Sequence, residues 1–360
     1  MLKTAPAVFA VGNCYQIMVE VKSQALMSVR IGDAIYYDET NGIMNSLSPL
    51  HRVTVPMEAL NEKKEYTVCI RPIVERLPYF TQTKPELEYT YTFRPVPQQD
   101  IRIYHISDAH NRIAEPVAAA MAFGEIDLLI LNGDVIDHSG DPEKFANIYE
   151  ICSELTGGSI PVVFSRGNHD MRGNYAEKFA DYTPNCSGNT YYTFRLGSLW
   201  GIVLDCGEDK EDGHEEYGYT VACHVFRQRQ TDFIRSIITN AENEYAHKDV
   251  KTKLVIAHNP ISRLNKAPFN IEADIYSQWS KLLKEHIKPN LMICGHMHKT
   301  NIFPVGGEID HLGQPCTIVI AAKPLEAGFV GGGFVIHDDT IDVVFTDNTG
   351  KTLKTATLEA

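Results

Sequence analysis

Hydrophobic and polar positions follow two different patterns along the 360-residue chain, and the change falls near residue 97. Before it, short segments rich in Val, Ile, Tyr and Thr tend to alternate and are separated by Gly, Asn, Asp and Pro. They lie at residues 14–22, 25–39, 50–57, 64–74 and 87–96. Strands that recur every ten to twenty residues are typical of an antiparallel β-sandwich. We therefore expect an all-β sandwich at residues 1–96 and a polar linker at residues 95–100.

After residue 100, apolar strands alternate with amphipathic helices. The pattern predicts strands at 101–107, 127–134, 160–170, 200–209, 252–260 and 291–298, with helices at 112–124, 141–155, 227–242 and 276–286. The strands are apolar almost throughout, which is typical of parallel strands buried on both faces. Further strands at 316–323, 332–338 and 340–347 complete a sheet. The sequence therefore predicts an α/β layered domain at residues 97–360.

Charge is distributed unevenly between these two regions. Residues 1–96 carry ten basic and ten acidic side chains, so the whole formal net charge of −13 lies in residues 97–360. An acidic chain without a basic run is a poor partner for nucleic acid, whose binding depends on Lys and Arg against phosphates. Acidic residues that hold divalent cations can nevertheless form a locally positive site. The composition therefore argues against nucleic-acid binding but leaves a phosphate-containing substrate open.

The N-terminus and the cysteines indicate the compartment. The first apolar stretch is short and interrupted by Pro6, unlike a signal peptide, and no 18-residue apolar run predicts a membrane helix. None of the eight cysteines forms a CxxC pair, so we interpret most as buried thiols in a reducing compartment, with a Cys14–Cys69 disulfide as the alternative. We expect a cytoplasmic protein; a secreted mature form is the alternative. The oligomeric state is left open.

Five of the predicted strands end in side chains of the kinds that bind metal ions. In chain order these are Asp108 and His110, then Asp134, then Asn168, His169 and Asp170, then His258, and finally His296 and His298. Ligands in open α/β sheets bind beyond the carboxyl ends of the strands. Residues i and i+2 of an extended segment project to the same side, so each Asp-x-His or His-x-His pair can address one site. We expect these side chains to converge.

Mixed imidazole, carboxylate and amide ligands suit Mn, Fe, Zn or Co better than a calcium or thiolate site. The set is too large for one tetrahedral ion, so two ions bridged by a carboxylate fit better. Such ions stabilise both the attacking and the leaving oxygen in hydrolysis.

The order DAH, GD, GNHD, H and GHMH resembles the calcineurin-like metallophosphoesterase superfamily over residues 101–300. The resemblance implies a four-layer α/β/β/α domain and a binuclear, metal-dependent phosphoric ester hydrolase in which metal-bridged hydroxide attacks phosphorus. It implies that the first metal is held by Asp108, His110 and His298, that Asp134 bridges, and that the second metal is held by Asn168, His258 and His296. His169 would be catalytic at the phosphoryl group or the leaving group, with Asp170 orienting it.

The region before residue 97 resembles, more loosely, the fibronectin-type sandwich that precedes the catalytic domain in purple acid phosphatases. The catalytic motifs depart from those enzymes, because the first motif has His110 in place of Gly and no tyrosine follows Asp134. The resemblance is therefore better to phosphodiesterase-like members with a sandwich domain in front, and we expect no purple ferric–tyrosinate colour.

Several assignments have two interpretations from sequence alone. Arg166 and Arg172, which flank GNHD, can clamp a substrate phosphate or form structural ion pairs. Asp137 and His138 can support the site or begin a helix. We expect residues 204–218 to form a solvated acidic loop; the alternative is that Asp205, Glu208 and Asp209 support the site.

The resemblance implies a phosphate-ester substrate, and either a monoester or a diester is compatible with these motifs. A nuclease of the same superfamily is a second hypothesis, which the acidic composition disfavours. A non-catalytic ligand- or partner-binding protein with a phosphatase-like domain is the third, and a missing ligand would favour it; none of the set is missing.

Overall fold

One long mixed sheet organises the molecule. The computed structural model describes residues 1–359, and fifteen of its strands form this sheet. Its central path runs β14–β15–β16–β17–β19–β20–β11–β12–β13–β1–β2–β7. The strands are β1 (Ala7–Val11), β2 (Cys14–Glu20), β7 (Leu50–Pro56), β11 (Ile101–Ile106), β12 (Leu128–Asn132), β13 (Pro161–Ser165), β14 (Tyr192–Leu196), β15 (Leu199–Leu204), β16 (Thr252–Ala257), β17 (Leu291–Cys294), β18 (Lys299–Phe303), β19 (Ile318–Leu325), β20 (Gly328–Ile336), β21 (Thr340–Asp347) and β22 (Thr352–Glu359).

The sheet contains two parallel blocks that are joined by an antiparallel strand. Strands β11, β12 and β13 are parallel, as are β15, β16, β17 and β19, and β20 runs antiparallel to both β19 and β11. A bridge between Gly12, in the turn after β1, and Phe194 of β14 brings the β1 end of the block of β11, β12 and β13 back to the first strand of the path. The two blocks therefore face each other across a shared interior.

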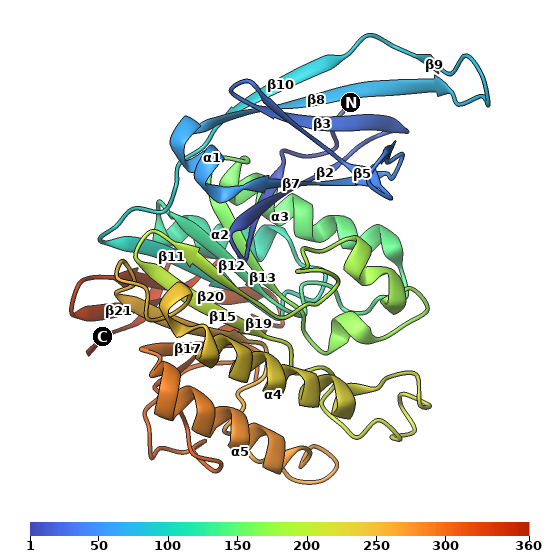
Figure 1. Ribbon diagram of the computed structural model, residues 1–360. Coiled ribbons are helices and arrows are strands. Elements are labelled where there is room, and N and C mark those ends of the chain that lie inside the picture. Colours follow the sequence, from blue (N-terminus) through green and yellow to red (C-terminus); the bar gives the residue numbers. More distant parts are fainter. Residues whose placement is uncertain (360) are drawn as a thin grey trace.

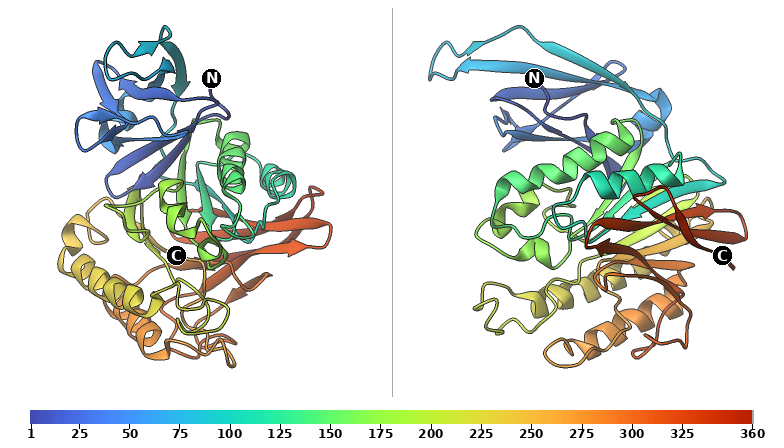
Figure 2. Two further views of the ribbon diagram at one scale, coloured as in Figure 1. Left: turned by 90° about the vertical axis from the view of Figure 1, so that its right-hand side faces the viewer. Right: turned by 180° about the vertical axis from the view of Figure 1, so that it is seen from behind.

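Helices cover the outer face of each block (Figures 1 and 2). Helices α2 (Ala114–Phe123) and α3 (Ala146–Thr156) share a core with β11, β12 and β13. Helices α4 (Cys223–Thr239) and α5 (Ala273–Leu282) share another with β15, β16 and β17. The result is an α/β/β/α arrangement, so the α/β prediction is confirmed.

The continuous apolar strands predicted from sequence have both faces buried. In β12, Leu128 and Ile130 enter the core between the two blocks, whereas Leu129 and Leu131 enter the core under α2 and α3. Because side chains alternate across a strand, a strand covered on both faces must be apolar at every position.

The N-terminal region is built onto the same sheet. Strand β1 pairs in parallel with β13, and β2 and β7 continue the sheet beyond it. Over these three strands lies a second sheet of β10 (Leu87–Thr92), β8 (Glu65–Glu75), β3 (Ala25–Ile31) and β4 (Ala34–Tyr37), with β9 (Gln82–Thr83) on β8. Two short strands, β5 (Glu39–Thr40) and β6 (Met44–Asn45), and helix α1 (Met57–Lys63) complete the region. The β-on-β packing expected for residues 1–96 is present, but one of its layers is the edge of the main sheet.

Strand β1 was absent from the sequence prediction. Its five residues are all buried and apolar, so they show no alternation that would mark a strand. The expected linker at residues 95–100 is also packed against the fold, since Val96 is buried in the central core and the hydroxyl of Ser198 donates to the carbonyl of Gln98. The division at residue 96 stays a prediction, and the main sheet and its core run across it.

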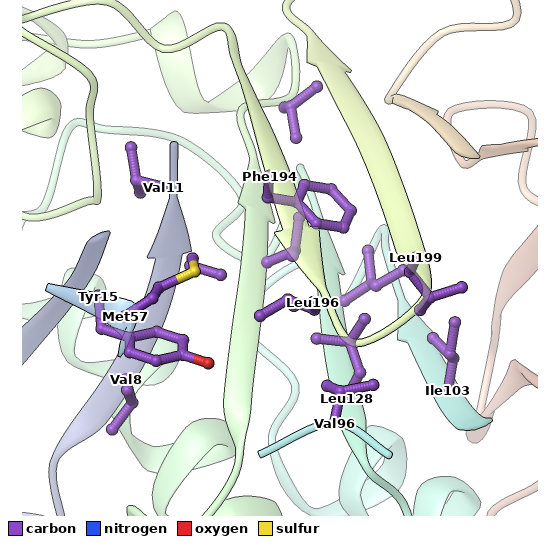
Figure 3. Packing of buried hydrophobic residues seen from close by; sticks show 14 of the residues in the cluster. Val8, Val11, Tyr15, Met57, Val96, Ile103, Leu128, Phe194, Leu196 and Leu199 are labelled. Carbon is purple, nitrogen blue, oxygen red and sulfur yellow. The ribbon is translucent and has the colours of Figure 1, made fainter. Parts of the chain in front are cut away.

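One hydrophobic cluster joins the two regions (Figure 3). It places side chains of the N-terminal region in one core with those of the β14–β15 hairpin, among them Val8, Val11, Tyr15, Met57, Phe194, Leu196 and Leu199.

All eight cysteines are free thiols, so the alternative Cys14–Cys69 disulfide is not formed. Among residues 1–359, none of the helices has the length and apolar character needed to cross a membrane.

Candidate metal centre

The loops after β11, β12, β13, β16 and β17 meet at the carboxyl ends of the two parallel blocks. Backbone hydrogen bonds join neighbouring loops. The Asp108 amide donates to the Gly133 carbonyl at 3.1 Å, and the His110 amide donates to the Asp134 carbonyl at 3.0 Å. The Gly295 amide donates to the His258 carbonyl at 2.9 Å. These bonds fix the backbone positions from which the predicted ligand side chains project.

A first ligand group consists of Asp108, His110 and His298. The Nε2 atoms of the two imidazoles lie 3.2 Å apart, and Asp108 Oδ1 lies 3.3 Å from His298 Nε2. Ligand atoms of the three residues all lie within 4.8 Å of one another. The structure thus brings together the set expected to hold the first metal.

A second group consists of Asp134, His258 and His296, with Asn168 beside it. His258 Nε2 lies 3.0 Å from Asp134 Oδ2, and His296 Nδ1 lies 3.0 Å from Asn168 Oδ1. His258 Nε2 is also 3.9 Å from Asp108 Oδ1, so the two groups adjoin.

Electrostatics at this site fit a bound cation. Asp108 and Asp134 are 0% and 1% exposed, and no Lys or Arg among the described residues pairs with either. Burial alone would lower the pKa of His258, but the charges of Asp134 and Asp108 raise it to about 10. Buried carboxylates without a permanent positive partner are costly, so the donor set is suited to divalent metal ions.

The orientation of His258 fits the same conclusion. Its Nδ1 lies 2.7 Å from the Asn132 carbonyl, which can only accept, so Nδ1 carries the proton. Nε2 is therefore the ring atom that faces the carboxylates, 3.0 Å from Asp134 Oδ2. A second hydrogen bond that fixes the tautomer in this way is usual for metal-binding histidines.

The backbone of the site is strained where the ligands project. Asp108, His110, Asp134, His296 and His298 all have φ between 45° and 64°, a region that non-glycine residues seldom occupy. Strain of this kind is concentrated at functional sites, where the surrounding structure enforces it.

Close approach of the loops also requires small residues. A methyl group at Gly295 would overlap Ser107 Oγ, and one at Gly167 would overlap the carboxylate of Asp134. The glycines of GHMH and GNHD therefore let the ligand loops pack against each other.

His169 lies beside the two ligand groups, but Asp170 does not orient it. His169 Nδ1 is 2.8 Å from the carbonyl of Asp137, whose carboxylate also lies 3.4 Å from Nδ1 of the ligand His110. The Asp170 carboxylate instead accepts hydrogen bonds from the backbone amides of Gly167 and Asp134. Burial and the charge of Asp134 raise the pKa of Asp170 to about 8. Asp137 thus contacts both imidazoles, as the alternative in which it supports the site requires.

Arg166 and Arg172 are occupied by carboxylates, as in the ion-pair alternative. Arg166 Nε lies 2.7 Å from Asp205 Oδ2. Arg172 forms a two-pronged pair with Glu208, with both nitrogen–oxygen distances at 2.9 Å, and its Nη1 lies 3.4 Å from His169 Nε2. The phosphate clamp predicted for these arginines is therefore absent from this arrangement.

The loop at residues 204–218 differs from the solvated loop that we expected. Asp205 and Glu208 are both fully buried. Thr190 and the Gly207 amide donate to Asp205, and Tyr217 donates to Glu208. The local sequence does not distinguish these buried carboxylates from the exposed ones beside them, because the arginines that neutralise them lie 36 to 39 residues away.

Comparison with known proteins agrees with this geometry. The family model for calcineurin-like phosphoesterases matches residues 101–300. The chain belongs to the calcineurin-like phosphoesterase family. The match spans every predicted ligand from Asp108 to His298, and the phosphoesterases of this family use divalent metals.

Solved structures extend the likeness in fold. A purple acid phosphatase from yellow lupin (Lupinus luteus) seeds is 12% identical and aligns over 99% of this chain and 74% of its own, with a TM-score of 0.59. A dimetal phosphatase from Danio rerio is 13% identical over 74% of this chain and 99% of its own, with a TM-score of 0.48. No curated protein matches the sequence. At 12% identity, the likeness to the purple acid phosphatase shows the fold alone.

Proposed function

We propose that this chain is a two-metal phosphoesterase, and that phosphodiesters are its better substrates. The observation that carries the proposal is the pair of adjoining ligand groups, in which two buried carboxylates and four imidazoles converge without a Lys or Arg among the described residues. Asp108, His110 and His298 would hold one ion and Asn168, His258 and His296 the other, with Asp134 between them. Mn, Fe and Zn all suit this set.

When bound, such ions lower the pKa of water and neutralise charge on the phosphoryl oxygens. The protein supplies the rest of the arrangement. The His169 amide donates to Asp134 Oδ1 at 2.9 Å, which ties the position of His169 to the carboxylate between the two groups. The His169 ring is partly exposed and adjoins His110, with 4.7 Å between ring centroids. We assign it to contact a phosphoryl oxygen or protonate the leaving oxygen as the ester bond breaks.

The preference for diesters follows from the two arginines. A phosphomonoester carries about two negative charges near neutral pH, whereas a diester carries one. Since Arg166 and Arg172 already pair with Asp205 and Glu208, neither is free to balance the second charge. The monoester alternative requires one of these ion pairs to open.

Metal-dependent hydrolysis tests the proposal. Protein stripped with a chelator and reloaded with Mn²⁺ should hydrolyse bis(p-nitrophenyl) phosphate faster than p-nitrophenyl phosphate at neutral pH. The stripped protein and the His258→Ala variant serve as controls and should both be inactive. Equal rates with and without metal would refute the two-metal site, and a faster monoester reaction would refute the diester preference.

A further inference from the structure

A pocket opens beside the ligand His296, between the loop that precedes α4 and the loop that precedes α5. Both loops extend from the same side of the molecule (Figure 1). The pocket is small, about 30 Å³, and its walls include Asp209, Asn259, Arg263, Asn265 and Phe269. It adjoins His296, beside the place proposed for the phosphate, and has room for a small group carried by the substrate.

Most cations around the site already have carboxylate partners. Besides the two arginines of the third motif, Lys210 Nζ lies 2.9 Å from both Asp209 and Glu216, and Arg227 lies 2.9 Å from Glu272. These pairs leave little uncompensated positive charge on the pocket walls.

Arg263 differs from the other cations. Across residues 1–359 its guanidinium forms neither an ion pair nor a hydrogen bond, although it is partly buried. Burial lowers the pKa of Arg263, and the more distant charge of Glu308 offsets this only in part. A partly desolvated guanidinium without a partner gains most from an anion that arrives with a ligand.

Two neighbours shape the rest of the pocket. Asn259 Oδ1 is a buried atom without a hydrogen-bond partner, so it can accept a donor from a ligand. The Phe269 ring is held on one side by Lys210, whose Nζ lies 4.9 Å from the ring centre. Within residues 1–359, the pocket therefore combines one free cation with one free acceptor and an aromatic face, and the Asp209 carboxylate on its wall is compensated by Lys210.

We propose that Arg263 binds a second anionic group on the substrate, a phosphate or a carboxylate carried by the substituent of the scissile phosphate ester. The proposal rests on the proposed function, because it places the scissile phosphate at the two ligand groups beside His296. Arg263 then determines specificity, because it selects phosphate esters whose substituent carries an anionic group of its own over esters with neutral substituents.

Inhibitors with one or two anionic groups test this role. Inhibition constants of ethylphosphonate, phosphonoacetate and methylenebisphosphonate would be measured against hydrolysis of bis(p-nitrophenyl) phosphate by the Mn²⁺-loaded protein. Calorimetry would measure the binding of the same three compounds directly. A second anion that meets Arg263 should tighten binding at least about tenfold relative to ethylphosphonate. Arg263→Gln should abolish that advantage, and Arg263→Lys should restore part of it. The matched control is Lys266→Gln, an exposed residue of the same loop that does not line the pocket, and it should retain the full advantage.

The two inhibitors distinguish a carboxylate from a phosphate, and the two measurements separate the anion site from the hydrolytic function. An advantage for phosphonoacetate alone assigns a carboxylate, and one for methylenebisphosphonate alone assigns a phosphate. Chelation of Mn²⁺ by an inhibitor affects the wild type and Arg263→Gln alike, so it does not produce a difference between them. An unchanged advantage in Arg263→Gln overturns the role of Arg263. If the wild type is inactive but calorimetry shows an Arg263-dependent advantage, the hydrolytic function fails and the anion site stands.

Discussion

Two pairs of buried carboxylates lie within the same domain, and they are compensated in different ways. Asp205 and Glu208 each pair with an arginine at 2.7 to 2.9 Å. Asp108 and Asp134 are equally buried, yet the charged side chains that face them are imidazoles. The first pair is neutralised by arginines of the chain itself, whereas the second pair lies among imidazoles that, with it, form the candidate metal-binding groups.

The difference shows how a buried carboxylate can be interpreted. A buried charge that has its own partner holds loops together, and here it fixes residues 204–218 against the GNHD loop. Buried carboxylates that face only imidazoles, which can themselves bind a metal ion, indicate a ligand site.

The largest effect is expected for Asp134→Asn. Loss of the carboxylate between the two ligand groups should reduce metal binding and lower kcat/KM by about 10³-fold or more, since each metal contributes several kcal/mol to the transition state. Metal stoichiometry by elemental analysis and turnover of the diester measure this. Glu125→Gln replaces an exposed carboxylate just before β12 and is the control, which should keep full metal content and rate. Full metal content in Asp134→Asn would contradict the ligand assignment.

His169→Asn should separate catalysis from metal binding. The ring contributes proton transfer or a hydrogen bond to the reacting group, so the rate should fall by about 10²–10⁴-fold while metal content is unchanged. His138→Asn replaces an exposed histidine on the neighbouring loop and should keep its rate within about twofold. Loss of metal in His169→Asn would mean that His169 is a ligand.

Glu208→Gln tests the internally neutralised pair. Removing one partner leaves Arg172 without its two-pronged carboxylate, which should lower the free energy of unfolding by roughly 3 kcal/mol. Denaturant titration measures the loss, and Glu211→Gln, an exposed carboxylate of the same loop, should cost less than about 0.5 kcal/mol. Metal content should stay full in both variants. A variant as stable as the wild type would show that the ion pair is not structural.

The smallest effect is expected for Asp137→Asn. The backbone carbonyl that holds His169 remains, but the carboxylate near His110 loses its charge. Loss of such a supporting carboxylate typically weakens metal affinity by about 10–100-fold. A Mn²⁺ titration of activity should therefore shift while the rate at saturating metal stays close to wild type, and Glu143→Gln is the exposed control. An unshifted Mn²⁺ titration would mean that Asp137 supports His169 but not His110.

The candidate metal ligands could be predicted from sequence, whereas the pairing of Glu208 with Arg172 could not, and the reason is physical. Asp108, His110, His296 and His298 could be proposed as ligands because each follows an apolar strand, and strand ends of a parallel sheet share one edge. Glu208 and Arg172 carry no such positional signal. Their pairing depends on how the loop after β15 folds over the GNHD loop.

The orientation of His169 shows the same limit at closer range. Asp170 is adjacent in sequence and was the natural orienting group, but its carboxylate turns toward the amides of Gly167 and Asp134. The carbonyl of Asp137, 32 residues earlier, lies next to the imidazole instead. Adjacency along the chain does not determine which atoms meet.

The sequence by itself determined the α/β character of residues 97–360, the ligand types and their place at strand ends, because these depend on local periodicity and short spacings. Tertiary structure alone decided that β1 joins β13, that both arginines of the third motif are paired, and that Arg263 is left without a partner. Each of these depends on contacts between segments far apart in the chain. Such contacts are selected by packing and charge compensation over the whole fold rather than by any local pattern.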